Sequence, residues 1–394
     1  MSNRGTDSKG LISAGDILLD QKLMALTPQE TPNVQPPAKP TEFANAQLSL
    51  FQTVLCNTDE ERERFSNAID LWDSVPRYSV SRQAQVKARE NGKFLDNHTT
   101  VFQHRDRTYT VTISPARVKD LDGNQRDFYP STTEELVEEA LRKLAIDQYS
   151  GFFDRPNFRS GVVFTIYQLR DELKKHGHTR SYQEIVLALN ILSKSVIEIR
   201  ENTGKGELLA ISPYLPALVA VSRDRLKDDP TAKWAVQFHP FVTDSIDKVT
   251  YRQYNYALLM SHESKLTRWL HKYIVLKCTG ADLIKPFSIH YATIKRDSCL
   301  LNEYTRERAA IDAVATAFED LQHKGVLKNF ERKNVTGSRK KLLDVVFTIW
   351  PSFEFVKEVK AANKRQSDGV QRVSQVGLPG GFRRTAVGRT GGSR

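Results

Sequence analysis

The fold is decided by residues 181–212, SYQEIVLALNILSKSVIEIRENTGKGELLAIS. Ser181 and Glu184 have the spacing of a capping box, which predicts that a helix begins here. The apolar residues that follow recur at helical spacing. Residues 196–200 and 208–212 then flank a polar, glycine-containing turn, a pattern that predicts a β-hairpin. We therefore expect one helix followed directly by one hairpin.

The residues upstream of this stretch complete a larger unit. The alternating segment 100–114 predicts a half-buried hairpin, and another capping box at 131–134 predicts a long helix. A short strand at 162–166 precedes a helix over 167–175, which is the helix immediately before the quoted stretch. The order of helix, turn, helix and hairpin predicts a winged-helix domain over residues 95–240.

The same order recurs over residues 241–352, which suggests a duplicated unit. Its expected elements are a helix (261–277), a strand (286–289), a short helix (290–297), a longer helix (306–323) capped by Thr305, and a hairpin (326–350). The segment between the two blocks, about 213–260, has no assigned form. The expected fold class is α+β, with two tandem winged-helix domains.

The two ends of the chain differ from these blocks in composition. Residues 1–46 contain several prolines, which predicts a flexible arm. Residues 361–394 are rich in glycine and arginine, which predicts a disordered basic tail. Between the arm and the first block lies Gln47-Leu48-Ser49-Leu50-Phe51. This peptide can anchor two apolar side chains in a partner's pocket, or it can form the first turn of the core.

Overall charge narrows the possible partners. The 394 residues include 58 basic and 47 acidic side chains, a net charge of +11, which favours a polyanion such as nucleic acid. The cysteines at 56, 278 and 299 are too far apart for a CxxC metal pair, and we expect a reducing cytoplasm. No apolar run is long enough to span a membrane. We therefore expect a soluble protein with no membrane contact and no cofactor.

Polar and basic residues lie where a winged helix contacts DNA. Such a domain places its second helix in the major groove and its hairpin on the neighbouring backbone. The candidates are Lys174, Lys175, Arg180, Tyr182 and Gln183 in the first block, and Lys295, Arg296, Arg306, Arg308, Lys328, Arg332, Lys333, Arg339, Lys340 and Lys341 in the second. Arg180, Gln183 and the two arginines at 306 and 308 are candidates for base contacts, since arginine suits the guanine edge. For any single residue, a solvated helix face is the alternative.

Enzymatic motifs are weak in this sequence. It has no GxxxxGK[ST] phosphate loop. A nicking initiator needs paired histidines around a bulky apolar residue as metal ligands, and His176-Gly177-His178 has glycine in the middle position. The tyrosines at 251, 254 and 256 are expected to belong to the core. We therefore expect a binding protein rather than an enzyme.

The order of the blocks, the segment FTIYQLRDEL at 164–173, and QLSLF at 47–51 resemble the TrfA-type plasmid replication initiators, within the iteron-binding Rep proteins. The resemblance covers about residues 47–350, and the basic tail departs from it. It implies binding to origin repeats, opening of an A·T-rich element, and recruitment of the host initiator DnaA and the helicase DnaB. It also implies that residues 47–51 bind the bacterial sliding clamp. A monomer and a homodimer both remain open, as does repression of its own gene.

Two other functions stay open at this point. The same folds could serve a transcriptional repressor, from which the clamp peptide would distinguish an initiator. A rolling-circle nicking enzyme is the more remote alternative.

Overall fold

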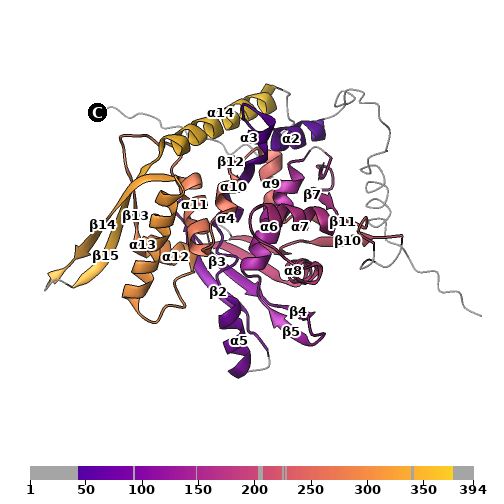
Figure 1. The fold of residues 1–394 in the computed structure, drawn as a ribbon, viewed down its shortest axis with the longest axis horizontal. Coiled ribbons are helices and arrows are strands. Elements are labelled where there is room, and N and C mark those ends of the chain that lie inside the picture. Colours follow the sequence, from indigo (N-terminus) through magenta and orange to yellow (C-terminus); the bar gives the residue numbers. More distant parts are fainter. Residues whose placement is uncertain are drawn as a thin grey trace, which may run out of the picture.

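The computed structural model describes residues 43–375, except 92–93, 148, 203–206, 224–225, 227–228 and 339–340. Helices and strands are mixed along the chain, which confirms the expected mixture of both (Figure 1). The expected arm lies outside the described residues except for 43–46, and so does the tail from residue 376 onward. No helix in the described part of the chain is long and apolar enough to cross a membrane.

A segment of short elements precedes the first predicted helix. It contains α2 (Phe43–Gln52), α3 (Asp59–Glu63), β1 (Phe65–Ile69), α4 (Asp70–Ser74), α5 (Arg82–Asn91), β2 (His98–His104), β3 (Arg107–Ser114), β4 (Ala116–Lys119) and β5 (Gln125–Phe128). The β2–β3 hairpin confirms the strand pattern of residues 100–114. Its two turn residues, Arg105 and Asp106, have positive φ angles, as in the tight turns of hairpins. The β4–β5 hairpin was not predicted.

The first block follows the predicted order. It contains α6 (Thr132–Ala145), β6 (Gly151–Asp154), β7 (Arg159–Phe164), α7 (Ile166–Lys175), α8 (Tyr182–Lys194), β8 (Val196–Asn202) and β9 (Glu207–Pro213). Both capping boxes form, and at α8 the Glu184 backbone N–H donates to Ser181 Oγ (3.2 Å) while the Ser181 N–H donates to Glu184 Oε2 (2.7 Å). Gly177, with φ +83°, ends the turn after α7. Local sequence signals therefore predicted the starts of α6 and α8 correctly.

The strands of the first block join two different sheets. The hairpin β8–β9 is extended by the upstream hairpin into one sheet with the order β2-β3-β8-β9. Strand β7 joins another sheet, with the order β10-β11-β7-β6, in which β10 (Ala217–Val221) and β11 (Lys233–Gln237) come from the segment that had no assigned form. The hairpin after α8 therefore forms one half of a four-stranded sheet, with β8 inside the sheet and β9 at its edge.

The second block also follows the predicted order. After α9 (Pro240–Lys248), β12 (Tyr251–Asn255) and α10 (Tyr256–Met260) come α11 (Lys265–Lys277), β13 (Phe287–His290), α12 (Tyr291–Ser298), α13 (Glu307–His323), β14 (Leu327–Thr336), β15 (Leu342–Pro351) and α14 (Phe353–Gln375). Its sheet has the order β13-β15-β14. The prediction that Thr305 caps the long helix was wrong by one residue, because the N-cap is Arg306, which makes no side-chain capping bond.

The two ends of the described chain pack against each other. Strand β1 pairs with β12, and α14 lies along β12 on the outside of the molecule (Figure 1). The buried guanidinium of Arg365 donates to Asn67 Oδ1 (2.6 Å) and to the carbonyl oxygens of Leu50 (2.8 Å) and Phe51 (3.2 Å). The prediction of a disordered tail from residue 361 is therefore wrong for residues 361–375, which continue an ordered helix.

A buried network of charges joins the two blocks. Asp73 of α4 accepts from Arg142 of α6 (Nη1 to Oδ2, 2.7 Å) and from Lys272 of α11 (Nζ to Oδ1, 3.0 Å). Both cations also pair with Glu139. Burial alone would raise the pKa of Asp73, but Arg142 and Lys272 more than offset it and hold that pKa well below its usual range. Removing one member would leave an uncompensated buried charge.

Candidate nucleic-acid interface

Helix α13 of the second block has one buried face and one open face. Ile311, Val314, Phe318 and Leu321 are buried, as their helical spacing predicted. On the opposite face, Arg308 and other polar side chains are exposed to solvent. The helix therefore packs by one stripe only and leaves its outer side accessible along its length.

Two arginines stand at the start of α13. Arg306 is the N-cap residue and Arg308 lies in the first turn, and both are exposed. Among the residues that the structure describes, neither guanidinium takes part in a hydrogen bond or an ion pair. The first turn of a helix also presents backbone N–H groups and the positive end of the helix dipole. These features together favour an anionic partner at this point.

The cations of α12 are held by carboxylates. Lys295 Nζ donates to Glu307 Oε2 of α13 (2.7 Å). Arg296 makes a two-point contact with Asp297 (2.6 and 2.8 Å), and Asp297 also accepts from the backbone N–H of Gln103 on β2. Arg296 therefore helps to seat the second block on the first block's sheet, a role that the sequence did not indicate.

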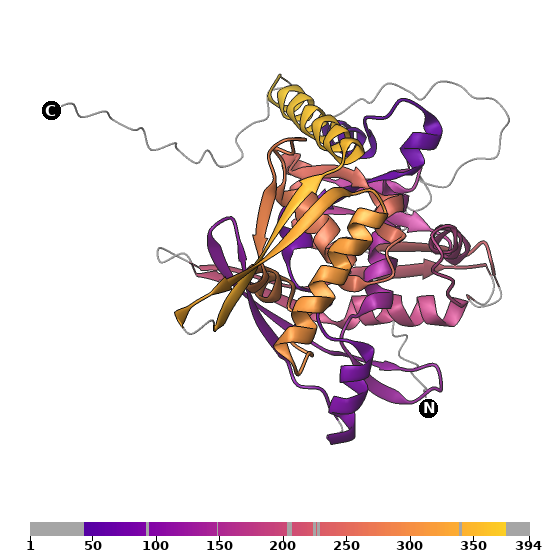
Figure 2. The same ribbon diagram turned by 60° about the vertical axis from the view of Figure 1, so that its left-hand side comes forward.

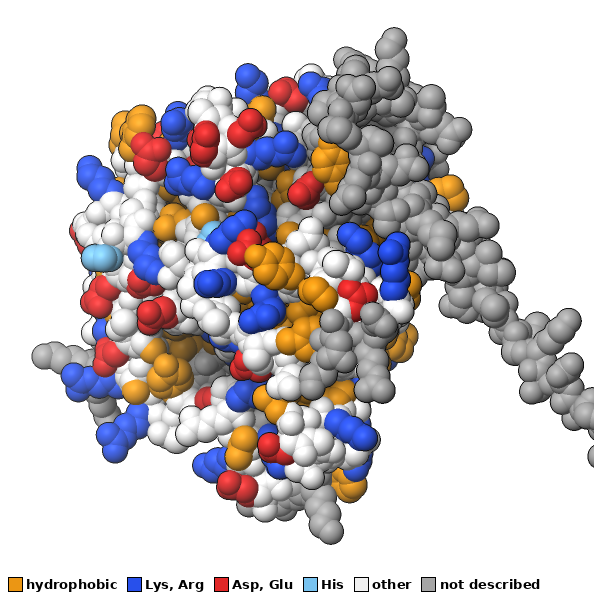
Figure 3. Space-filling model, turned by 45° about the vertical axis from the view of Figure 1, so that its right-hand side comes forward, with side chains coloured by type: hydrophobic (Ala, Val, Ile, Leu, Met, Phe, Trp, Pro, Cys, Tyr) orange, Lys and Arg blue, Asp and Glu red, His pale blue; other side chains and the backbone are white. Residues whose placement is uncertain are grey.

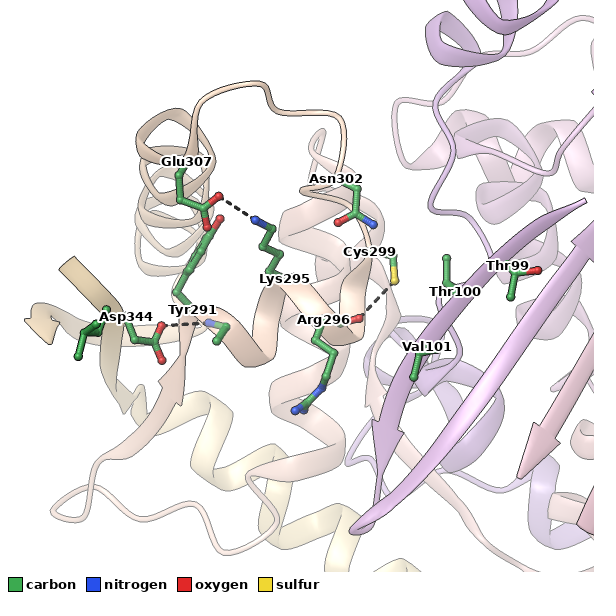
Figure 4. A pocket seen from close by; sticks show the side chains of 12 residues that line it. Thr99, Thr100, Val101, Tyr291, Lys295, Arg296, Cys299, Asn302, Glu307 and Asp344 are labelled. Carbon is green, nitrogen blue, oxygen red and sulfur yellow. Dashed lines mark hydrogen bonds and ion pairs between the residues drawn. The ribbon is translucent and has the colours of Figure 1, made fainter. Parts of the chain in front are cut away.

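An open groove of about 460 Å³ lies between α12, the start of α13, the start of β15 and strand β2 (Figure 4). Lys295 and Arg296 line it from one side, and Thr99 and Val101 of β2 line it from the other. At the far end, Asp344 Oδ1 accepts from the backbone N–H of Ala292 (3.1 Å). The residues from β2 were missed by the sequence reasoning, because no local pattern reports a contact between blocks.

The hairpin β14–β15 carries the other cations predicted for the second block. Lys328, Lys333 and Lys341 are exposed. Arg332 reaches across to α13, where its Nη1 lies 2.9 Å from Asp312 Oδ1. Arg339 and Lys340 fall outside the described residues. The described cations thus lie along one hairpin. In its register, Arg332 pairs with Phe347 and Lys333 with Val346 of β15.

Helix α8 of the first block is enclosed on two sides. Ile185, Leu189 and Leu192 face the main core. On another side the hairpin β4–β5 covers the helix, where Ile191 joins Val118 and other residues in a small separate cluster. Along the described helix, the side chains that remain exposed are therefore at its two ends, Gln183 in the first turn and Lys194 in the last.

The candidate residues around that turn have mixed environments. Lys174 and Gln183 are exposed, whereas Lys175 pairs with Asp171 (3.3 Å). Arg180 donates to the backbone oxygen of Thr179, and the Tyr182 hydroxyl donates to that of Leu226. Figure 3 shows the side of the molecule where the first block lies, and there blue and red side chains are interspersed. The two sets of candidates lie on different parts of the molecule, with α8 right of centre and α13 at the left in Figure 1.

The peptide at 47–51 lies in a different place from the one expected. It belongs to α2, with Gln47 fully buried and Phe51 only 1% exposed. The Phe51 ring meets Tyr251 edge to face at 5.1 Å, and Leu50 packs against the same core. The prediction that this peptide lies on the arm outside the cores is wrong, because its aromatic anchor fills space beside β12. A clamp pocket cannot take Phe51 from this conformation.

The histidines at 176 and 178 support the packing of α7. His176 Nε2 lies 3.3 Å from Glu172, and the His178 ring hydrogen-bonds to the backbone oxygen of Met260 (2.7 Å). Within the described ranges, no group of three His, Cys, Asp or Glu side chains is arranged to hold a metal ion. The tyrosines at 251, 254 and 256 are buried, as expected.

Comparison with known proteins gives distant structural similarities. No family model matches the chain, and no curated protein matches it. The solved structure of domains 2 and 3 of RctB is similar, with a TM-score of 0.45 and 10% identity over 72% of this chain and 98% of that one. The Pi initiator protein in complex with iteron DNA is similar with a TM-score of 0.32 and 11% identity, over 74% and 98% of the two chains.

Proposed function

We propose that this protein binds repeated sites in double-stranded origin DNA and initiates plasmid replication there, with the second block as the main DNA reader. The observation that carries the proposal is the start of α13, where two unpaired, exposed arginines stand beside a cationic hairpin. In a winged helix these are the positions that meet base edges and the phosphate backbone.

The second block supports this assignment through its topology. Helices α12 and α13 are joined by a turn, and β13 pairs with β15 beside β14, as expected of a three-stranded wing sheet. With α13 in the major groove, Arg306 or Arg308 would meet guanine N7 and O6. The lysines of the hairpin would contact phosphates and fix the register without reading sequence.

The resemblance to TrfA-type initiators supports the more specific parts of the proposal. These are opening of an A·T-rich element, recruitment of DnaA and DnaB, and control of the protein's own gene. The first block, in which the middle of α8 is covered on two sides, would then contribute backbone contacts beside the site read by α13. No catalytic step on DNA is proposed, and the working location is the bacterial cytoplasm.

A winged-helix transcriptional repressor is the second candidate, and one observation favours it. The clamp peptide would have separated an initiator from a repressor, and Phe51 is buried in α2. The DNA-binding surface of the two candidates is the same. Only the events after binding distinguish them.

Two measurements on the full chain test the proposal. Binding to a duplex carrying the DNA repeats beside the gene should weaken with salt, with a log–log slope of about −6 if about seven phosphates are neutralised. A slope shallower than about −3 contradicts docking of both blocks. A plasmid that carries only the gene and its flanking repeats should replicate. Tight repeat binding without replication would select the repressor.

A further inference from the structure

The hairpin β14–β15 projects beyond the body of the molecule as a two-stranded ribbon (Figure 2). Residues 331–336 of β14 are exposed, whichever face of the strand they lie on, and so are Leu342 and Leu343 at the start of β15. An isolated two-stranded ribbon in water is marginally stable. Its outer half adds little to the core and is accessible to a partner.

The strand pairing of this ribbon is interrupted at one apolar residue. Val335 pairs with Asp344 and Thr336 pairs with Leu342, so Leu343 lies between them without a partner, as the extra residue of a β-bulge. The Leu343 side chain is 65% exposed. Bulges change the direction of a side chain and increase the local twist. Among the described residues of the ribbon, Leu343 has the most exposed apolar side chain, and contact with a partner would remove that surface from water.

The turn next to this bulge is shaped around the leucine. A Cβ atom added at Gly337 would lie 2.9 Å from Leu343 Cδ1, so glycine leaves the space that the side chain occupies. Leu343 also lines the open groove together with Lys295 and Glu307. It therefore lies toward the start of α13, on the side where the proposed DNA would dock.

The charge around Leu343 suits a nucleic acid. Residues 327–351 contain six basic and two acidic side chains. An apolar side chain flanked by cations on a projecting ribbon has the character of a wedge that enters the minor groove between two base pairs. Pyrimidine–purine steps such as TA unstack most easily and are frequent in A·T-rich DNA.

We propose that Leu343 is a minor-groove wedge, which enters one base step of the bound duplex, unstacks it and kinks the DNA. The inference rests on the proposed function, because it requires duplex binding by the second block. The cations beside it hold the backbone, while the bulge directs the leucine toward the bases. The protein would thus weaken stacking at one defined step of each site.

The test uses the full chain at saturating concentration on a duplex carrying the repeat. End-to-end energy transfer reports the bend, and permanganate reactivity reports unstacked thymines. The wild-type protein and Leu343→Met should bend the duplex and make thymines at one step reactive. Leu343→Ala should lose that reactivity and most of the bend while still binding. Ile284→Ala is the matched control, because Ile284 is 83% exposed in the loop before β13, away from the ribbon, and should behave as wild type.

Three results would overturn the inference, and a loss of binding by Leu343→Ala calls for a second measurement. If the wild-type protein binds without reactive thymines, or if Leu343→Ala bends and unstacks the duplex as the wild type does, Leu343 is not a wedge, and its exposure serves a protein partner. If Leu343→Ala fails to bind, a cleavage reagent attached through Leu343→Cys must cut the bound duplex within its minor groove, and cutting elsewhere rejects the proposal. If the wild type binds no repeat DNA at all, the proposed function fails first.

Discussion

The two blocks share one order of elements but surround their second helices differently. In the first block, α8 is flanked by the core and by the hairpin β4–β5, and the hairpin that follows it is joined to the hairpin β2–β3 in a four-stranded sheet. In the second block, α13 keeps an open face, and β14–β15 extends into solvent. A repeated order of elements therefore does not imply a repeated function. We infer that the second block reads DNA and that the first mainly supports and positions it.

The largest expected effect concerns the contact between the blocks. Arg142→Met should lower the free energy of unfolding by about 3–5 kcal/mol, because Asp73 and Glu139 would remain buried with too little positive charge. Chemical denaturation measures this, and it should show a single transition if the blocks unfold together. Arg105→Ala is the control, since its pair with Asp70 is on the surface and should contribute less than about 1 kcal/mol. Two separate transitions in the wild type would show that the blocks are independent.

The next effect separates the two helices as DNA readers. Arg308→Ala should weaken binding to the repeat by about 1–3 kcal/mol, with the loss confined to particular base positions. Gln183→Ala, at the equivalent turn of α8, should cost less. Binding to a panel of single-base variants of the repeat measures both. A larger loss for Gln183→Ala would reverse the assignment of the main reader.

A third prediction concerns His239, the N-cap residue of α9. His239 is buried against Trp72, and its Nδ1 accepts from the Phe241 backbone N–H, so the ring must stay neutral there. Burial, aided by Arg77, lowers the pKa of His239 to about 3. The unfolded chain takes up the proton near pH 6.5 and the folded chain does not, so stability is complete above that pH and falls as pH drops. Between pH 6.5 and 5 the loss should be about 1.5 kcal/mol.

His239→Asn keeps a helix cap and removes the titrating ring. Its stability should therefore depend less on pH in that window than the wild type's does, as measured by thermal unfolding at several pH values. An unchanged pH dependence would mean that other groups are responsible. The buried histidine pair His262 and His271, whose pKa values are also lowered by burial, is the first place to look.

The smallest effect is in the salt dependence of binding. Lys341→Ala should make the log–log slope shallower by about 0.9, the change expected for one lost phosphate contact, and should weaken all DNA sequences alike. Lys174→Ala in the first block should change the slope by less. Equal changes for both would mean that the two blocks contact the backbone equally.

Local signals in the sequence predicted helices α6, α7, α8, α11, α12 and α13 and the hairpins β2–β3, β8–β9 and β14–β15. The capping box at Ser181 and Glu184 formed as its spacing required, and so did the long hairpin after α13. The cap predicted at Thr305 is wrong because the helix begins at Glu307, so that Arg306 and not Thr305 occupies the N-cap position. Patterns that depend on neighbours within a few residues therefore placed these helices to within about four residues, the largest error being α11, which was expected from 261 and begins at Lys265.

Contacts between distant segments left no such signal. Strand β1 pairs with β12 although the first block lies between them in the sequence. No pattern in either strand identifies the other as its partner. Phe51 looked like part of a free peptide because it follows the proline-containing arm and because residues 47–51 resemble a clamp-binding motif. In the structure, Tyr251 packs against its ring and Arg365 donates to its backbone oxygen. The bulge at Leu343 depends on the register between two strands, which residue types alone do not fix.

The pairing of β1 with β12 limits how such a chain can be divided in evolution or in the laboratory. Strand β12 begins the second block, but its partner strand comes from the N-terminal segment, and α14, which packs on it, follows the second block. A fragment made of residues 241–352 alone would lose both neighbours and expose the side that they cover. A transfer of the second block into another protein must therefore also carry the N-terminal segment with β1 and the helix α14, so this block is not an exchangeable module.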